Sequence, residues 1–206
     1  MEFYKCEVNS NYIFCELNDL YLEQTTNLLN SEWPRSYFER SKILKLSYEN
    51  KQSSYQLPVS LILTSKDRNE VIGHAALSFI EIINLDIENP NVYLQSLVVS
   101  KNCRKQGFGK MILNQCEKYL QEFLRQNSTY KFNEIYLNTK DQQLFYLNCG
   151  YSKIEPLLFN TNSRNNKFNQ IVKNLFNQQQ TGNNKLATSN SNDSDEKGTW
   201  FKKKFI

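Results

Sequence analysis

Glycines and basic residues gather in residues 96–113, which read SLVVSKNCRKQGFGKMIL. The segment passes from a β-branched apolar stretch through a basic turn into a long amphipathic helix. A strand that leads through such a turn into a helix presents unpaired backbone N–H groups at the positive end of the helix dipole. Gly107 and Gly109 let the backbone approach a ligand closely, while Arg104 and Lys110 add positive charge. The pattern predicts a site for an anion such as a phosphate group.

The spacing of this turn, RxxGxG, limits which phosphate site it can be. It differs from the GxxxxGKS/T loop of nucleoside triphosphatases, and no GxGxxG dinucleotide fingerprint is present. A glycine turn with surface lysines before a helix is often only a structural turn, so a ligand site needs a second signal elsewhere in the chain.

Composition limits the function classes. The 206 residues are enough for one domain with a sizeable core, and we expect residues 1–206 to form a single domain. A net charge of +4 suits a local anion site, and the basic residues form no aromatic-interleaved stripe, so nucleic-acid binding is not expected. No stretch approaches 18 apolar residues, and the N-terminus lacks a signal-peptide pattern. We therefore expect a cytoplasmic protein without a membrane partner.

The cysteines and the single histidine argue against disulfide and metal chemistry. The five cysteines are odd in number, widely spaced and without a CxxC pair, and His74 has no second histidine with which to share a metal. We expect neither a disulfide framework nor a metal site.

Hydrophobic periodicity predicts the elements that must position the turn. Residues 57–65 and 71–83 are apolar runs separated by the polar turn KDRNE, which predicts an antiparallel hairpin. Residues 91–100 predict a third strand. Apolar residues recur at i, i+3 and i+4 from Gly107 to about Gln126, the strongest helical signal in the chain.

The N-terminal part predicts one strand and two helices. Residues 3–8 and 11–17 both have strand-like composition, but their imperfect alternation favours only one strand. Residues 20–30 predict a helix capped by the Asn-Asp pair that precedes it. Pro34 suits the first turn of a second, basic helix that continues towards residue 50.

The C-terminal part predicts two strands around a short helix. Residues 132–139 and 151–159 are the strands, and the helix between them is capped by Asp141 and closed by Gly150.

A low-complexity insertion is predicted at residues 160–198, which are rich in Asn, Gln, Ser, Thr and Lys. Residues 199–206, TWFKKKFI, alternate like a terminal strand, which argues for an insertion within the domain. Apolar residues at helical spacing in residues 168–176 predict a helix that either docks on the domain or binds a partner.

Two blocks together resemble the GNAT superfamily of N-acetyltransferases. LQSLVVSKNCRKQGFGKMIL is followed about thirty residues later by LFYLNCGY. In that family the R/Q-x-x-G-x-G/A turn holds the pyrophosphate of acetyl-CoA, and the strands flanking the helix part to admit pantetheine. The resemblance implies an α/β fold with a mixed, mostly antiparallel twisted sheet, splayed at its middle and flanked by about four helices.

The same resemblance implies acetyl-CoA as co-substrate, with no metal. It assigns cofactor binding to the strand, the turn and the later helix, at Leu97, Val98, Val99, Arg104, Lys105, Gln106, Gly107, Phe108, Gly109, Lys110, Gln142, Phe145 and Tyr146.

Further blocks resemble the actin N-terminal acetyltransferases, a subfamily that modifies the acidic first residue of processed actin. They are NSEWPRSYFERSKILK, VIGHAALS, LNTKDQQLFYLNCGY and WFKKKFI, which keep their order outside residues 160–198. The resemblance implies transfer to the free amino group of an Asp- or Glu-initial protein, with actin as the expected partner. Animal members carry a proline-rich insertion that recruits profilin, whereas residues 160–198 contain no proline, so profilin recruitment is not expected.

Acetyl transfer needs a neutral amine, a polarised thioester carbonyl and a proton for the departing thiolate. The resemblance points to Tyr146 as the proton donor and to the backbone N–H groups of Leu97 and Val98 for the carbonyl. Gln95 stands where the resembling enzymes often have a glutamate, and an amide cannot take a proton. We therefore assign deprotonation to water, assisted by Gln95 or His74. Tyr146 as a packed aromatic and His74 as a structural hydrogen-bonder are the alternatives.

The acceptor is expected against the second predicted helix, because guanidinium groups pair well with carboxylates. The substrate-binding residues implied there and on the strand opposite are Trp33, Arg35, Ser36, Arg40, Asn138 and Thr139. A solvated helix face is the alternative for the arginines. Two other functions stay open: a GNAT enzyme that acts on small amines or lysine, and a non-catalytic acyl-CoA-binding regulator.

Overall fold

The structure is a computed structural model that describes residues 4–49, 55–67, 69–80, 82, 91–157 and 198–205. Within these residues one mixed sheet has the strand order β1-β2-β3-β4-β5-β6-β8-β7. The strands are β1 (Lys5–Asn9), β2 (Tyr12–Glu16), β3 (Val59–Ser65), β4 (Glu70–Ile80), β5 (Asn91–Val99), β6 (Glu134–Thr139), β7 (Ser152–Ile154) and β8 (Thr199–Lys204). All neighbours are antiparallel except β5 and β6.

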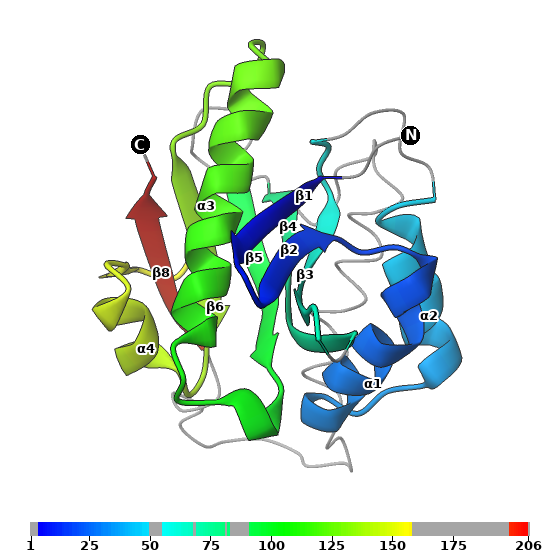
Figure 1. Ribbon diagram of the computed structural model, residues 1–206. Coiled ribbons are helices and arrows are strands. Elements are labelled where there is room, and N and C mark those ends of the chain that lie inside the picture. The colour runs from blue at the N-terminus through cyan, green and yellow to red at the C-terminus, as the bar shows by residue number, and fades with distance from the viewer. Residues whose placement is uncertain are drawn as a thin grey trace.

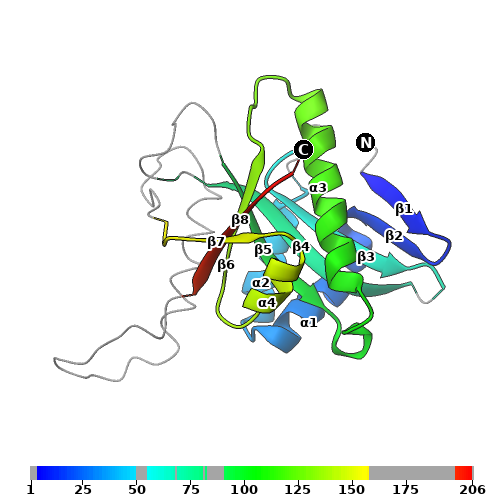
Figure 2. The same ribbon diagram turned by 90° about the vertical axis from the view of Figure 1, so that its left-hand side faces the viewer.

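Helices cover both faces of the sheet (Figures 1 and 2). One face packs against α1 (Leu22–Glu32) and α2 (Tyr37–Leu46), whose Leu29 and Leu44 join Ile62 of β3 in one apolar cluster. The other carries α3 (Phe108–Gln126) and α4 (Gln143–Asn148) over a larger core. β3 is buried along its whole length, as expected of a strand covered on both sides. The predicted mixed, mostly antiparallel sheet with four flanking helices is confirmed in the described part of the chain.

The elements with the strongest sequence signals were predicted most accurately. The hairpin of β3 and β4, the strand β5 and the helix α3 all lie where apolar periodicity predicts them. β8 pairs with both β6 and β7, so the TWFKKK segment enters the sheet as a strand. The predicted helix at 168–176, and residues 160–197 of the predicted insertion, lie outside the described residues.

Three local predictions were wrong, each because of turn or cap chemistry. Both N-terminal segments are strands, joined by a turn in which the Asn9 side chain accepts hydrogen bonds from the amides of Asn11 and Tyr12. α2 begins at Tyr37 because Ser36 is its N-cap. The N-cap residue of α4 is Gln142, which makes no side-chain cap hydrogen bond, so the predicted cap at Asp141 is wrong.

The first helix has the predicted cap at Asn18, but this residue caps a short 3-10 helix and α1 itself begins only at Leu22. Asn18 accepts a hydrogen bond from the amide of Leu20 in a short 3-10 helix, Asp19–Tyr21, which leads into α1. Among the described residues, no helix combines the length and apolar character needed to cross a bilayer.

Candidate active site

The basic glycine turn joins β5 to α3 with two residues in the left-handed region. Lys105 has φ 61° and Gly107, the N-cap of α3, has φ 85°. A Cβ built on Gly107 would meet no atom within 4 Å, so the backbone conformation rather than lack of space requires glycine. Gly107 contributes no side-chain cap to the helix. The first amides of α3 therefore face an exposed turn, as the anion-site prediction requires.

Gly109 allows α4 to approach the start of α3. A Cβ at Gly109 would lie 3.0 Å from a ring atom of Phe145. The structure thus brings together the two motif blocks that the sequence separates by about thirty residues. The second glycine of the motif is needed for packing between helices, whereas the first is needed for its φ angle.

Arg104 connects the turn to β5 and to α1. Its Nε donates to the carbonyl of Val99 over 3.0 Å, and its Nη2 lies 2.6 Å from a carboxylate oxygen of Glu32 at the end of α1. The side chain predicted to add charge for a phosphate therefore has two protein partners. In this arrangement it holds the shape of the turn and links it to the helix that covers the opposite face.

β5 and β6 part after a short parallel contact. Val92 pairs with Ile135 and Tyr93 with Tyr136, and the register ends there, although both strands continue. This is the splayed sheet that the family resemblance implies. At the parting point Tyr93 is buried, and burial, followed by the nearby phenol of Tyr146, raises the pKa of its phenol.

Tyr146 stands on α4 among aromatic rings. Its ring centroid is 5.6 Å from that of Tyr151 and 6.3 Å from that of Phe201, and 8% of its surface stays exposed. Burial raises the pKa of the Tyr146 phenol well above its ordinary value, and Cys149 adds to the shift. The phenol therefore keeps its proton at neutral pH, which a proton donor must do.

A bulge interrupts β5 beside this gap. Gln95 lies opposite Ala76 and Val98 opposite His74, so Ser96 and Leu97 together face the single residue between them on β4. Ser96 has φ 55°, an unusual conformation for a non-glycine residue.

The sheet face under α1 and α2 carries a line of polar side chains next to the bulge. Gln95 of β5 donates from Nε2 to the hydroxyl of Ser78 on β4 over 3.4 Å. His74 of β4 is buried, and its Nδ1 lies 3.1 Å from the carbonyl of Ser96. Sequence predicted Gln95 and His74 as candidates, and the structure places both on one face because they alternate with core residues.

Arg40 is a buried cation on the same side. Its Nε donates to Asn30 Oδ1 over 2.5 Å, and its Nη2 donates to the carbonyl of Trp33. Burial, and secondarily Arg35, lowers the pKa of its guanidinium to about 10, so it stays charged at neutral pH. Among the described residues it forms no ion pair with a carboxylate.

The remaining predicted acceptor residues also have local roles. Ser36 caps α2, and Thr139 Oγ1 accepts a hydrogen bond from the amide of Gln142 over 3.2 Å at the start of α4. Burial lowers the pKa of Arg35, and Glu39 opposes the shift. Asn138 pairs with Trp200 of β8 near the parting strands.

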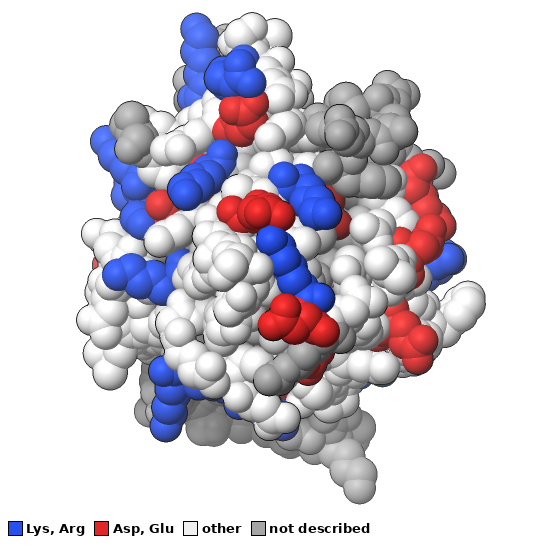
Figure 3. Space-filling view, in the orientation of Figure 1, with Lys and Arg blue, Asp and Glu red and all other residues white. Residues whose placement is uncertain are grey.

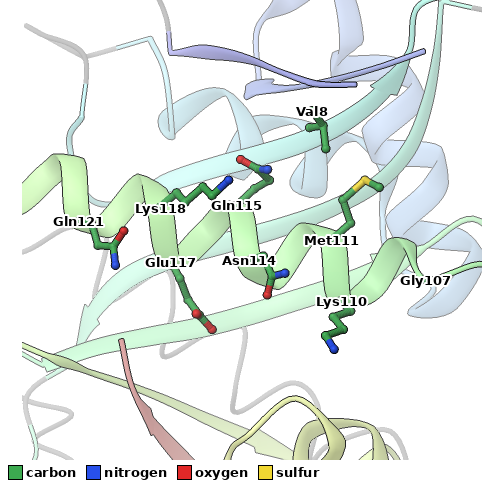
Figure 4. Close-up of a pocket in the computed structure, with 9 residues that line it drawn as sticks. All are labelled: Val8, Gly107, Lys110, Met111, Asn114, Gln115, Glu117, Lys118 and Gln121. Atoms are coloured by element: carbon green, nitrogen blue, oxygen red, sulfur yellow. The ribbon is translucent and has the colours of Figure 1, made fainter. Parts of the chain in front are cut away.

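A groove of about 540 Å³ opens at the head of α3 (Figure 4). It is lined by Gly107 and Lys110 and continues along the outer side of the helix to Gln121, with Val8 of β1 above it. None of its lining residues belongs to β5 or β6. The groove therefore adjoins the glycine turn and does not coincide with the gap between the strands.

Charges of both signs are interspersed on the face that carries α3 (Figure 3). Lys203 of β8 lies 2.6 Å from Glu117 of α3, and Arg125 pairs with Glu122 within that helix. The described residues form no continuous basic stripe on this face.

Sequence reasoning missed Tyr93, Ser78 and the bulge residue Ser96. Tyr93 and Gln95 are two positions apart in a strand, so alternation could have placed both on one face. Ser78 and His74 have a similar relation, four positions apart on β4. No local signal marks Ser96, because serine has no preference for a left-handed conformation.

Comparison with known proteins agrees with the geometry. The sequence model described as Acetyltransferase (GNAT) family matches residues 19–151. That range holds the glycine turn, the parting strands up to β6 and the short helix α4.

Solved structures share the fold at low sequence identity. An aminoglycoside 6′-N-acetyltransferase complexed with coenzyme A has a TM-score of 0.57 at 15% identity, covering 100% of this chain and 98% of that one. A GNAT-family acetyltransferase from Staphylococcus aureus Mu50 has a TM-score of 0.54 at 16% identity, with coverage of 95% and 99%. The N-acetyltransferase YhbS from Escherichia coli, in complex with CoA, has a TM-score of 0.50 at 17% identity, with coverage of 72% and 73%.

Proposed function

The chain belongs to the acetyltransferase (GNAT) family and is an acetyl-CoA-dependent acetyltransferase, and we propose that it acetylates the free amino group of acidic protein N-termini. The proposal concerns the acceptor and the residues that carry the reaction. The observation on which it mainly depends is the buried, charged Arg40 beside the polar face of the sheet, without a carboxylate partner among the described residues.

The described residues fit the acyl donor. The turn from Arg104 to Gly109 opens onto uncapped amides of α3, which suit a diphosphate, and the gap where β5 leaves β6 suits an extended chain. Bound acetyl-CoA supplies the acetyl group as an activated thioester. Backbone amides near Leu97 and Val98, at the bulge, would orient its carbonyl.

An acidic acceptor fits the opposite side of the sheet. A buried guanidinium retains donors that a carboxylate can accept, and partial desolvation strengthens such pairs. Arg35 lies close enough to Arg40 to lower the pKa of Arg40, so two positive charges are held near each other between α1 and α2. Repulsion between them would be relieved by an Asp or Glu side chain of the acceptor.

The amine needs little help to become reactive. A protein α-amine has a pKa of about 7.7 to 8.0, against about 10.4 for lysine, so a useful fraction is neutral at pH 7. The amide oxygen of Gln95 would orient this amine, since its Nε2 is engaged by Ser78. A water molecule would take the proton. Tyr146 would donate its phenolic proton to the departing sulfur and regain a proton from water, so that the thiol gains the proton that the amine loses.

Actin is the acceptor protein that we propose, because its processed N-terminus is acidic and the motif blocks resemble the subfamily that modifies it. With no proline in residues 160–198, we propose that actin binds without profilin.

Mass spectrometry on matched peptides tests the acceptor. Peptides that differ only in their first residue, Asp, Glu, Ser or Met, are incubated with the protein and acetyl-CoA, beside an aminoglycoside and spermidine as small amines. We expect α-amine acetylation of the Asp- and Glu-initial peptides only. Equal use of all four peptides, or acetylation of the small amines instead, would overturn the proposal.

A charge reversal tests the arginines. Arg35→Glu should lower kcat/KM for the acidic peptides by roughly 10- to 100-fold, the range expected for a lost charge-assisted hydrogen bond, and leave the KM for acetyl-CoA unchanged. Lys45→Glu is the matched control, because Lys45 lies in the last turn of α2, the helix that Arg35 precedes, and pairs with Glu49 over 3.8 Å. An equal loss in both variants would mean that only the overall charge matters.

A further inference from the structure

The single histidine lies directly beside the bulge of β5. His74 is 1% exposed, and its Nδ1 lies 3.1 Å from the carbonyl oxygen of Ser96. Ser96 is the bulge residue with φ 55°. A carbonyl cannot donate, so this contact is a hydrogen bond only if Nδ1 carries the proton.

The bulge is closely packed as well as hydrogen-bonded. A Cβ added to the neighbouring Gly73 would lie 2.8 Å from the carbonyl oxygen of Val98 and 2.5 Å from Cδ1 of Ile112. β4 therefore holds β5 through a close backbone approach at Gly73 and through the imidazole at His74. Both contacts act on the residues that lie next to the gap between β5 and β6.

We propose that His74 is a positioning residue, whose Nδ1–H holds the Ser96 carbonyl and so fixes the bulge that orients Leu97 and Val98. The role rests on the proposed function of these two residues in orienting the thioester. His74 itself touches no reacting atom in this scheme and takes no proton.

The surroundings of the ring keep it neutral. Its Nε2 is buried and has no hydrogen-bond partner among the described residues. Burial lowers the pKa of His74 to about 4, with a smaller contribution from the nearby Arg40, while the Ser96 hydrogen bond acts in the opposite direction. With Nδ1 protonated and Nε2 bare, the ring has one fixed tautomer.

Nitrogen-15 NMR of the full chain tests the tautomer without any substrate. Because the chain has one histidine, labelling with ¹⁵N-histidine gives one pair of ring nitrogen signals. We expect the Nδ1–H tautomer, with shifts that do not change between pH 6 and pH 8. A dominant Nε2–H tautomer, or a titration midpoint inside that range, would overturn the proposal whether or not the acceptor assignment holds.

Two substitutions then separate positioning from proton transfer. His74→Leu removes the ring donor, and His74→Asn retains a donor at a position close to that of Nδ1. With the acceptor that the peptide series identifies, we expect kcat to fall at least tenfold in the leucine variant, with little change in acceptor KM. The asparagine variant should recover at least a third of the lost turnover.

The asparagine variant decides the outcome, since it is informative even if the leucine variant fails to fold. A kcat of His74→Asn at least tenfold below that of the wild type, with unchanged melting temperature, would assign the imidazole to proton transfer. Loss of an acid limb from the pH profile of kcat/KM in His74→Asn would lead to the same conclusion.

Discussion

The proposed donor side and the proposed acceptor side of the sheet are built from different parts of the chain. On the donor side, the turn from Arg104 to Gly109 works through backbone geometry, with positive φ angles and exposed amides. On the proposed acceptor side, Arg40 and Gln95 work through buried or half-buried polar side chains. Backbone amides can bind any diphosphate, whereas side chains distinguish one acceptor from another.

This contrast explains which half of the site can vary. The turn has the shape that its glycines allow, and the ligand proposed for it is the coenzyme typical of the family. The acceptor face depends on few side chains, each held by a neighbour, such as Ser78 for Gln95 and Asn30 for Arg40. If the proposed acceptor site is right, a change of one of them should alter specificity without disturbing the donor side.

We expect the largest effect at Tyr146, because it is a side chain on the donor side, which otherwise works through its backbone. Tyr146→Phe removes only the hydroxyl, so we expect kcat to fall by about 10²- to 10⁴-fold, the range of general acid catalysis, at little cost in stability. The KM for acetyl-CoA should change little. Steady-state kinetics and thermal melting of the variant measure both.

Tyr151→Phe is the matched control for that substitution. Tyr151 touches Tyr146, is 2% exposed, and its hydroxyl has no hydrogen-bond partner among the described residues. We expect normal turnover in this variant. Normal turnover in Tyr146→Phe as well would leave Tyr146 as a packing residue and remove the acid from the scheme.

The buried His74 should make the stability of the protein depend on pH. Its pKa is lowered from 6.5 to about 4 in the folded protein. Between these values the unfolded chain binds the proton more readily, so the stability that the neutral ring contributes is present above pH 6.5 and lost as pH falls towards 4. At low pH this shift lowers the free energy of unfolding by at most roughly 3 kcal/mol.

Denaturant unfolding of the wild type and His74→Asn between pH 7.5 and pH 4 measures this effect. Carboxylates titrate in both proteins, so only the difference between the two curves reports on the imidazole. We expect the wild type to lose more stability than the variant as pH falls. Parallel curves would mean that His74 charges easily in the folded state.

The sequence predicts the donor side better than the acceptor side for a physical reason. A glycine turn, a strand before it and the strong period of α3 are local, and they specify the backbone that the diphosphate needs. The acceptor side depends on contacts between different segments, such as the one that joins Gln95 to Ser78 or Arg40 to Asn30. Composition and spacing cannot show which polar side chain a distant residue holds.

Gly107 tests whether the donor side depends on its backbone conformation, and the expected effect is the smallest of those described. Because a Cβ there would meet nothing within 4 Å, a substitution changes only the cost of φ 85°. Gly107→Val should disfavour the turn by about 1 to 2 kcal/mol and raise the KM for acetyl-CoA about tenfold, with the preference for acidic peptides intact. Gly107→Asn is the control, since asparagine tolerates this conformation and should keep KM within about threefold of the wild type. Equal effects in the two variants would show that the side chain, and not the φ angle, disturbs the donor site.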